Sequence, residues 1–300
     1  MDLKSLTLLF LFTFLLHLTA VDAAVPQQTI CIAYTANLNG QVQPCDCPGS
    51  DLGGIAYLST VIDSLRREHP RLLLFDSGDF LNSYRAPVLN HLMWEFMNRL
   101  SYTAVGLGEQ EFTEGSEFLH RQLSLNPLPL VAGNLRLRDQ IQRPDSLRII
   151  RTGDGCRIAV FSIFDANDSF AGNTRLYSAV PVRESLTKLL RQETAKAEIR
   201  ILLYHGGFDR ALQIAEQFPQ IQIIIAGHSQ QRQQVLKQAQ VIVQPGTDGE
   251  FLGFLQVEKS NGSWEFKNSF IPVHHNRAPD RNMQRKIQMH LDRKERKGHD

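Results

Sequence analysis

Five polar residues that could bind a ligand each follow an apolar, strand-like run of the chain within a few positions. In chain order they are Asn37, Asp79, Glu109, His205 and His228. In a sheet of parallel strands the carboxyl ends share one edge, and ligands bind at that edge. The pattern therefore predicts that these side chains form one ligand-binding cluster. The alternative is that they are ordinary loop residues, because loops that follow strands are polar in any protein.

A second feature that could do chemistry is the segment Pro44-Cys-Asp-Cys-Pro48, which makes Cys45 and Cys47 redox candidates. Two cysteines one residue apart can close a strained, reducible disulfide or bind a soft metal ion, and each can instead pair with a distant cysteine. The chain has four cysteines, which allow three pairings, and the other two are Cys31 and Cys156. Because Cys31 and Cys156 each begin an apolar run, buried free thiols are the alternative at those positions.

The elements that would position these residues alternate between strands and helices along most of the chain. Apolar spacing predicts helices over residues 52–65, 86–100, 114–125 and 182–196. Apolar runs predict strands over residues 29–34, 71–75, 102–105, 130–132, 158–163, 199–203 and 221–225. Further strands are predicted at 240–243, 251–258 and 263–271, with a tight turn at Asn261-Gly262, and a polar surface helix is predicted after His274. This order predicts an α/β fold with helices over a sheet.

The first residues have the order of a secretory signal: Lys4, an apolar run from Leu6 to Val21, and small residues around Ala23. The run is shorter than the ~20 residues that span a bilayer, so residues 1–24 are predicted to be a cleaved signal peptide rather than a retained anchor. The mature protein would be exported, to the periplasm or beyond, with no stable membrane insertion. A formal charge of +1 lacks the basic surplus of nucleic-acid-binding proteins, so no nucleic-acid partner is expected.

Several short motifs resemble, in order, those of the 5′-nucleotidase and UDP-sugar hydrolase family within the calcineurin-like metallophosphoesterases. Asp76-Ser-Gly-Asp79 matches the family's Asp-x-Gly-Asp, and Gly227-His-Ser-Gln230 lies where the family has Gly-His-Ser-His. The other matching segments are residues 34–40, 53–54, 108–113, 203–206 and 244–246. The resemblance implies a four-layer αββα sandwich of two mixed β-sheets flanked by helices. Residues 25–273 would form this domain, and residues 274–300 a polar, basic C-terminal helix or tail.

The family binds two divalent metal ions, and a water between them becomes the nucleophile because two cations lower its pKa. By this resemblance, one metal position here would be formed by Asp79, Glu109, His205 and His228. Two carboxylates and two imidazoles suit Mn²⁺, Zn²⁺ or Fe²⁺. The alternative is a relic site in which the histidines are satisfied pocket residues and Asp79 caps a turn.

The second metal position of the family would correspond to Asn37, Asn39 and Gln230, where the family has an aspartate and two histidines. Amide oxygens are uncharged and bind transition metals poorly, so this position is expected to be weak or lost and the protein to bind one ion rather than two. The family's acid/base dyad would correspond to Gln110 and Thr113. Glutamine can donate a hydrogen bond but cannot carry a proton.

Three functions remain open from the sequence. The first is a one-metal hydrolase of nucleotides or other small phosphate monoesters, with Asp79, Gln110 and His205 as the candidate catalytic residues. The second is a catalytically impaired metal-binding or thiol-redox protein that uses Cys45 and Cys47. The third is a scaffold that binds a ligand or partner without a metal. The family also contains exported proteins with similar Asn-Leu-Asn-Gly and Cys-x-Cys segments, and that resemblance implies no defined substrate.

Overall fold

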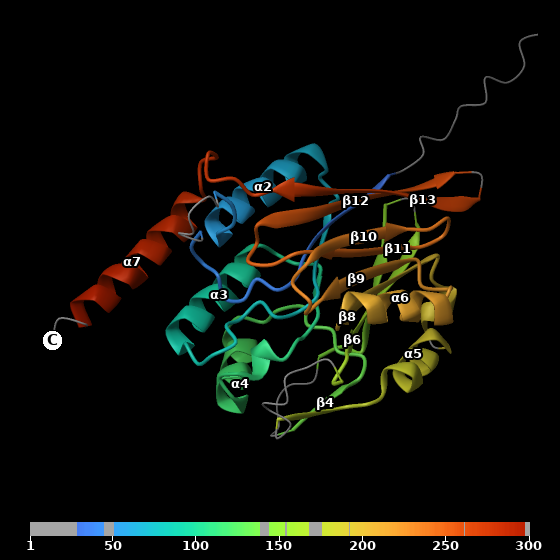
Figure 1. Ribbon diagram of the computed structural model, residues 1–300, viewed down its shortest axis with the longest axis horizontal. Coiled ribbons are helices and arrows are strands. Elements are labelled where there is room, and N and C mark those ends of the chain that lie inside the picture. The colour runs from blue at the N-terminus through green and yellow to red at the C-terminus, as the bar shows by residue number, and fades with distance from the viewer. Residues whose placement is uncertain are drawn as a thin grey trace, which may run out of the picture.

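The computed structural model describes residues 29–44, 51–138, 144–153, 155–167, 176–191, 193–260 and 262–297. Two mixed β-sheets lie face to face in the centre of the molecule, and helices cover their outer faces (Figure 1). This arrangement confirms the expected four-layer sandwich. The predicted signal peptide and the redox candidates Cys45 and Cys47 lie outside the described residues.

The first sheet has five strands in the order β13-β12-β1-β2-β3. Their bounds are Ile30–Thr35 for β1, Leu73–Asp76 for β2, Ala104–Val105 for β3, Phe251–Ser260 for β12 and Ser263–Pro272 for β13. Strands β1, β2 and β3 are parallel, whereas β12 is antiparallel to both of its neighbours. The three parallel strands therefore end at one edge, from which the loops of the candidate site begin.

The second sheet has six strands in the order β10-β11-β9-β8-β6-β5. Their bounds are Leu147–Arg151 for β5, Arg157–Phe164 for β6, Ile199–His205 for β8, Ile223–Gly227 for β9, Arg232–Leu236 for β10 and Val241–Pro245 for β11. The four central strands are parallel, and the edge strands β5 and β10 are antiparallel to them. A small two-stranded sheet pairs β4 (Leu135–Leu137) with β7 (Tyr177–Ala179).

Alternation of side chains along the strands divides the interior into three apolar layers. Ile30, Ile32 and Tyr34 of β1 point into the core between the two sheets, and Ala33 points to the opposite side. That side is covered by α2 (Ile55–Glu68), α3 (Pro87–Arg99) and α4 (Ser116–Leu125). The outer face of the second sheet is covered by α5 (Val182–Arg191) and α6 (Phe208–Gln217). With both faces covered, the central strands are apolar throughout.

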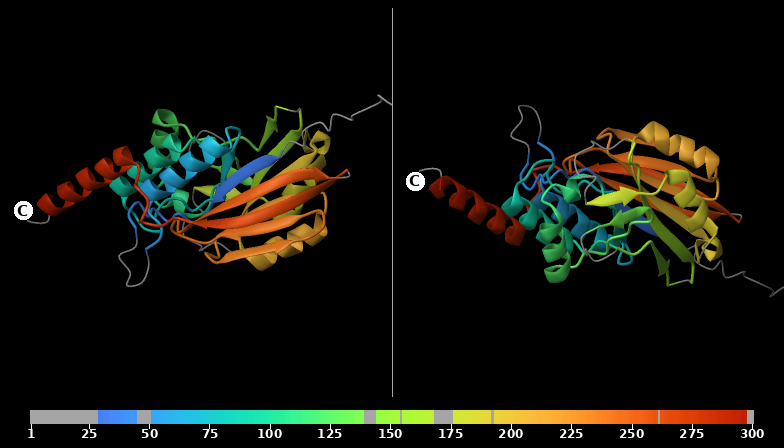
Figure 2. Two further views of the ribbon diagram at one scale, coloured as in Figure 1. Left: turned by 90° about the horizontal axis from the view of Figure 1, so that it is seen from above. Right: turned by 90° about the horizontal axis from the view of Figure 1, so that it is seen from below.

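The C-terminal helix α7 (Arg281–Lys297) begins against α2 and then extends away from the body of the molecule (Figure 2). Met283 and Ile287 are buried and anchor its first two turns. The Asp280 carboxylate accepts hydrogen bonds from the backbone N–H groups of Asn282 and Met283, which is how a helix N-cap is satisfied. No helix in the described part of the chain combines the length and the apolar character needed to cross a membrane.

Some predicted elements were wrong. Residues 130–132 form no strand and contribute only isolated bridges, and the helix expected over 182–196 ends at Arg191 and is followed by a 3-10 turn (Glu193–Lys196). Strands β5 and β10 were not predicted, because polar residues at sheet edges break their apolar pattern. Helix α6 was missed although Phe208, Ala211 and Ile214 recur at helical spacing, since two of its four buried residues are alanines.

Candidate metal centre

The four residues expected at the first metal position lie together. Asp79, Glu109, His205 and His228 each offer one ligand atom, and these atoms lie within 4.8 Å of one another. The first two follow β2 and β3 of one sheet, and the two histidines lie at the ends of β8 and β9 of the other. The centre therefore bridges the two sheets at the edge where their parallel strands end.

Glu109 lies between the two imidazoles. Its Oε2 is 3.0 Å from His205 Nε2, and its Oε1 is 3.1 Å from His228 Nδ1. Burial raises the pKa of the Glu109 carboxyl, but hydrogen bonds from His205 and His228 outweigh burial and hold that pKa well below its ordinary value. Glu109 is therefore ionised and ready to balance the charge of a cation.

His205 is fixed in the orientation of a metal ligand. Its Nδ1 lies 2.9 Å from the carbonyl oxygen of Ser77, so Nδ1–H donates outward and Nε2 faces the carboxylates. Nε2 is 3.4 Å from Asp79 Oδ2 as well as close to Glu109. Burial lowers the pKa of His205, but the charges and hydrogen bonds of Asp79 and Glu109 raise it well above its ordinary value. A proton on Nε2 thus occupies the direction in which a cation would bind.

The loop that carries Asp79 is shaped by the end of β2. Asp76 is buried, accepts a hydrogen bond from the Thr35 hydroxyl at 2.6 Å, and accepts a second from the Gly78 backbone N–H at 2.8 Å. Burial raises the pKa of Asp76 to about 7, against the effect of these hydrogen bonds. Gly78 has a φ of 96°, and a Cβ there would lie 2.5 Å from the backbone nitrogen of Gly108. The close approach of the two loops therefore requires glycine.

A buried carboxylate that the sequence analysis gave no role holds these two loops together. Both oxygens of Glu111 accept backbone hydrogen bonds, Oε2 from Asp79 at 3.0 Å and Gly108 at 2.7 Å, and Oε1 from Phe80 at 2.9 Å and Leu81 at 3.2 Å. Glu111 is completely buried in the 3-10 turn η1 (Gln110–Phe112). In the sequence, only the position of Glu111 within the motif at 108–113 could have indicated this role. Outside such a motif, a glutamate is expected at the surface.

At the second metal position, the Asn37 side chain is buried and both ends of its amide are engaged. Its Nδ2 donates to the carbonyl oxygen of Gly246 at 3.1 Å, and its Oδ1 accepts from the His228 backbone N–H at 2.7 Å. Asn37 therefore positions a histidine of the first position. Gln230, in contrast, is exposed and makes no hydrogen bond with any described residue.

Asn39 and Gln110 form an amide chain that reaches Asp79. Asn39 Nδ2 donates to Thr247 Oγ1 at 2.7 Å and to Asp248 Oδ1 at 2.9 Å, and its Oδ1 accepts from Gln110 Nε2 at 3.0 Å. The same Gln110 Nε2 donates to Asp79 Oδ2 at 3.0 Å, and the Gln110 backbone N–H donates to Asp79 Oδ1, also at 3.0 Å. Gln110 thus orients the central carboxylate. Its Oε1 is buried and accepts no hydrogen bond from the described residues.

Five of the predicted site residues have a left-handed backbone. Their φ angles are 52° for Asn37 and Asn39, 60° for Asp79, 78° for His228 and 58° for Gln230. Each such non-glycine residue costs on the order of 1–3 kcal/mol, and such strain gathers at functional sites. Asparagine, aspartate and histidine are the non-glycine residues found most often in this region, so all of these except Gln230 are of a favoured type.

Comparison with known proteins agrees with the fold and with the motifs. No protein-family model matches the chain. The 5′-nucleotidase of Bos taurus is 26% identical over 197 residues, and the match covers 59% of this chain but only 33% of the relative. A 5′-nucleotidase precursor from Thermus thermophilus has a TM-score of 0.76 at 20% identity, with 88% of this chain and 59% of that chain covered. The calcineurin-like phosphoesterase YfkN from Bacillus subtilis has a TM-score of 0.70 at 20% identity, with 89% and 98% covered.

The described chain therefore has the fold of these phosphoesterases and is similar in sequence to 5′-nucleotidases, as its motifs predicted. It corresponds to about a third of the length of the curated relatives that it matches. The donor set of two carboxylates and two imidazoles, held close together by buried loops, fits a divalent metal ion of the kind that such phosphoesterases use.

Proposed function

We propose that this protein is an exported, metal-dependent phosphoric ester hydrolase that binds one divalent ion, Mn²⁺, Zn²⁺ or Fe²⁺, through Asp79, Glu109, His205 and His228. The observation that carries the proposal is the convergence of these four side chains within 4.8 Å. Two carboxylate ligands balance the charge of one divalent cation, and two imidazoles complete a four-ligand set. Small phosphate monoesters, such as nucleotides, are the proposed substrates because the relatives are named 5′-nucleotidases.

The amide groups support one ion rather than two. A second cation beside Asp79 would need lone pairs of the Asp79 carboxylate. Gln110 Nε2 already donates to Asp79 Oδ2 at 3.0 Å. The amino groups of Asn37 and Asn39 likewise donate to acceptors of the loop at 246–248. Three amide donors thus occupy the region where carboxylate and imidazole ligands would be required.

A divalent cation at this centre would polarise the phosphoryl oxygen and lower the pKa of a nearby water. The protein's own residues would do the rest. The Asp79 and Glu109 carboxylates would balance the charge of the cation, and the Ser77 carbonyl keeps His205 Nε2 facing the cation position. Gln110 keeps Asp79 in place, and its unpaired Oε1 can accept a hydrogen bond from a bound water or a substrate hydroxyl. Gln110 cannot protonate the departing alcohol, so the reaction favours leaving groups that depart as anions.

Metal content and hydrolysis test this proposal together. The mature protein, reconstituted with each of the three ions, is expected to bind one equivalent and to hydrolyse a phosphate monoester. Glu109→Ala is expected to lose both properties. Glu117→Ala, at an exposed carboxylate of α4, is the matched control and should keep both. Two equivalents of tightly bound metal would contradict the single-ion site, and a metal-loaded protein that cleaves no phosphate ester would contradict the hydrolase.

Export is a separate part of the proposal and rests on the signal-like pattern of residues 1–24. N-terminal sequencing of the protein recovered from a secretion-competent bacterial host is expected to begin after Ala23 or Ala24. Retention of Met1 in the cytoplasmic fraction would contradict export and would leave the proposed chemistry untouched.

A further inference from the structure

A cavity of about 700 Å³ opens at the end of the sandwich that carries the amino ends of β1 and β2. The metal-centre residues follow the carboxyl ends of the same strands, so the cavity lies at the opposite end of the sheet. A volume of this size is typical of pockets that bind small molecules. Nothing in the chemistry proposed for the metal centre uses this cavity.

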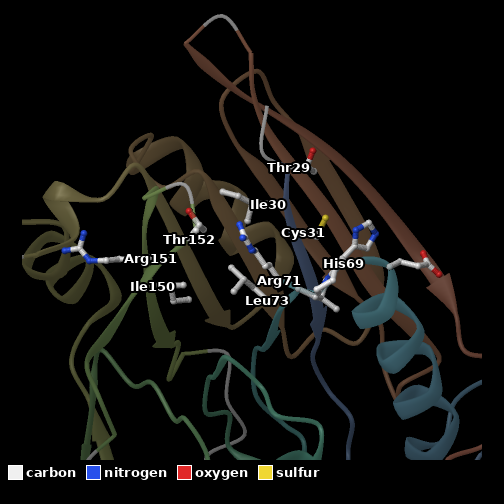
Figure 3. Close-up of a pocket in the computed structure, with 13 residues that line it drawn as sticks. Thr29, Ile30, Cys31, His69, Arg71, Leu73, Ile150, Arg151 and Thr152 are labelled. Carbon is white, nitrogen blue, oxygen red and sulfur yellow. The ribbon is translucent and has the colours of Figure 1, made fainter. Parts of the chain in front are cut away.

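The wall of the cavity is aliphatic. Ile30, Leu73 and Ile150 all face it (Figure 3), and they continue the apolar layer between the two sheets. Leu73 and Ile150 remain only half-buried, because the cavity separates the two sheets at this end. An apolar ligand that filled the space would remove this surface from water, and that burial is favourable.

One exposed cation lies at the mouth of this aliphatic space. Arg71 precedes β2 and extends across the gap toward Thr152, while Arg151 points away from the cavity (Figure 3). A Cβ at Gly153 would lie 2.4 Å from Arg71 Nη1, so the guanidinium rests directly against that backbone. Among the described residues, Arg71 has no hydrogen-bond acceptor and no ion-pair partner. The described residues therefore leave its five N–H donors unused.

Several other polar groups of the lining already have partners or are exposed. The Thr29 hydroxyl donates to Glu258 at 3.0 Å, and the Thr152 hydroxyl donates to the Cys156 carbonyl oxygen at 3.3 Å. His69 stacks on Phe254 with ring centroids 5.2 Å apart. Glu68 is the acidic residue of the described lining and is exposed. Among the described lining residues, Arg71 and Arg151 thus outnumber the acid Glu68.

We propose that this cavity is a binding site for a small amphipathic anion, an apolar ring or short chain that carries one carboxylate, sulfonate or phosphate group. The anionic group pairs with the Arg71 guanidinium, and the apolar part packs on Ile30, Leu73 and Ile150. A guanidinium binds such oxyanions through two parallel hydrogen bonds, which makes the contact both strong and directional. The site is independent of the metal centre and of its proposed reaction.

Two fluorescent probes with the same rings test the site. One is 1-anilinonaphthalene-8-sulfonate, which is anionic, and the other is N-phenyl-1-naphthylamine, which lacks the sulfonate. The folded mature protein is expected to bind the anionic probe in a one-to-one complex. Arg71→Gln should weaken that binding about tenfold or more, the loss expected for one charge-assisted contact, and leave the neutral probe unaffected. Ile150→Trp, which narrows the cavity, should weaken binding of both probes.

Arg121→Gln is the matched control, because Arg121 is an exposed arginine of α4 that does not line the cavity. It should bind both probes as the unchanged protein does, and thermal melting should verify that every variant is folded. Equal binding of the anionic probe by Arg71→Gln and the control would overturn the proposal. Absence of binding up to millimolar probe would also overturn it.

Discussion

Replacement of Glu111 by glutamine tests how the metal centre is positioned. In Glu111→Gln an amino group takes the place of one carboxylate oxygen. The two backbone N–H groups that donated to that oxygen then face another donor. Whichever oxygen is replaced, two of the four hydrogen bonds are lost, since each oxygen accepts two. Burial and the nearby Asp79 carboxylate raise the pKa of Glu111 to about 8, so the comparison is made above that pH, where the group is ionised. A hydrogen bond to a charged group contributes about 1.5–3 kcal/mol, and release of a buried charge offsets part of the loss. We expect the free energy of unfolding to fall by about 3 kcal/mol.

The same substitution should also loosen the ligand set. Because Glu111 holds the backbone at Asp79 and Gly108, its loss shifts the central carboxylate, and support groups of this kind change metal affinity by about 10–100-fold. Urea unfolding followed by circular dichroism measures the stability, and isothermal titration with Mn²⁺ or Zn²⁺ measures the affinity. Glu117→Gln on the surface of α4 is the matched control, expected within about 0.5 kcal/mol of the unchanged protein. If Glu111→Gln matched that control in stability, the role assigned to these hydrogen bonds would be wrong.

Four further predictions concern the centre itself. In the metal-free protein, the depressed pKa of Glu109 stabilises the fold above pH 4.5, and this contribution is lost as the pH falls through the folded-state pKa. The raised pKa of His205 stabilises the fold below pH 6.5, and this contribution is lost as the pH rises through its folded-state pKa. The stability difference between the unchanged protein and Glu109→Gln, measured by urea unfolding, should therefore peak between these two values. Removal of the ion by a chelator should lower the melting temperature, because an ion present at 100 times its dissociation constant adds about 2.7 kcal/mol to the free energy of unfolding. An unchanged melting temperature would argue against a bound ion. Gly108→Ala should weaken metal binding at least about tenfold in a titration, since the new Cβ would lie 2.2 Å from Asp79 Oδ1. Gln110→His should reduce the rate ratio between 4-nitrophenyl phosphate and phenyl phosphate, because an imidazolium can protonate the poorer leaving group; an unchanged ratio would exclude position 110 from proton transfer.

Much of the architecture follows from apolar periodicity and motif order. The buried parallel strands are almost wholly apolar, so β1, β2, β6, β8 and β9 are recognisable without a structure. The edge strands β5 and β10 of the second sheet are not, because one side of each faces solvent and tolerates arginines and glutamines. The isolated bridges at Leu130 and Val131 are too short to leave a periodic signal.

The convergence of the two acids and two histidines could be anticipated, because each residue follows a strand that ends at the same edge. The amide network could not, since hydrogen-bond direction depends on side-chain rotamers that no spacing encodes. Gln110 could be recognised in sequence as a departure from a motif, but its double contact with Asp79 and Asn39 appears only in the structure. Glu111 shows the same limit, because its partners are four backbone N–H groups from two separate loops.

The left-handed backbone at Asn37, Asn39 and Asp79 restricts which substitutions these loops can accept. Aspartate and asparagine both adopt this conformation readily, so one can replace the other while the loop keeps its course. A ligand can therefore be lost or regained through single exchanges of acid and amide, without an intermediate that misfolds. The same reasoning makes Asp79→Asn a cleaner inactivating change than Asp79→Ala, which would add backbone strain to the loss of a ligand.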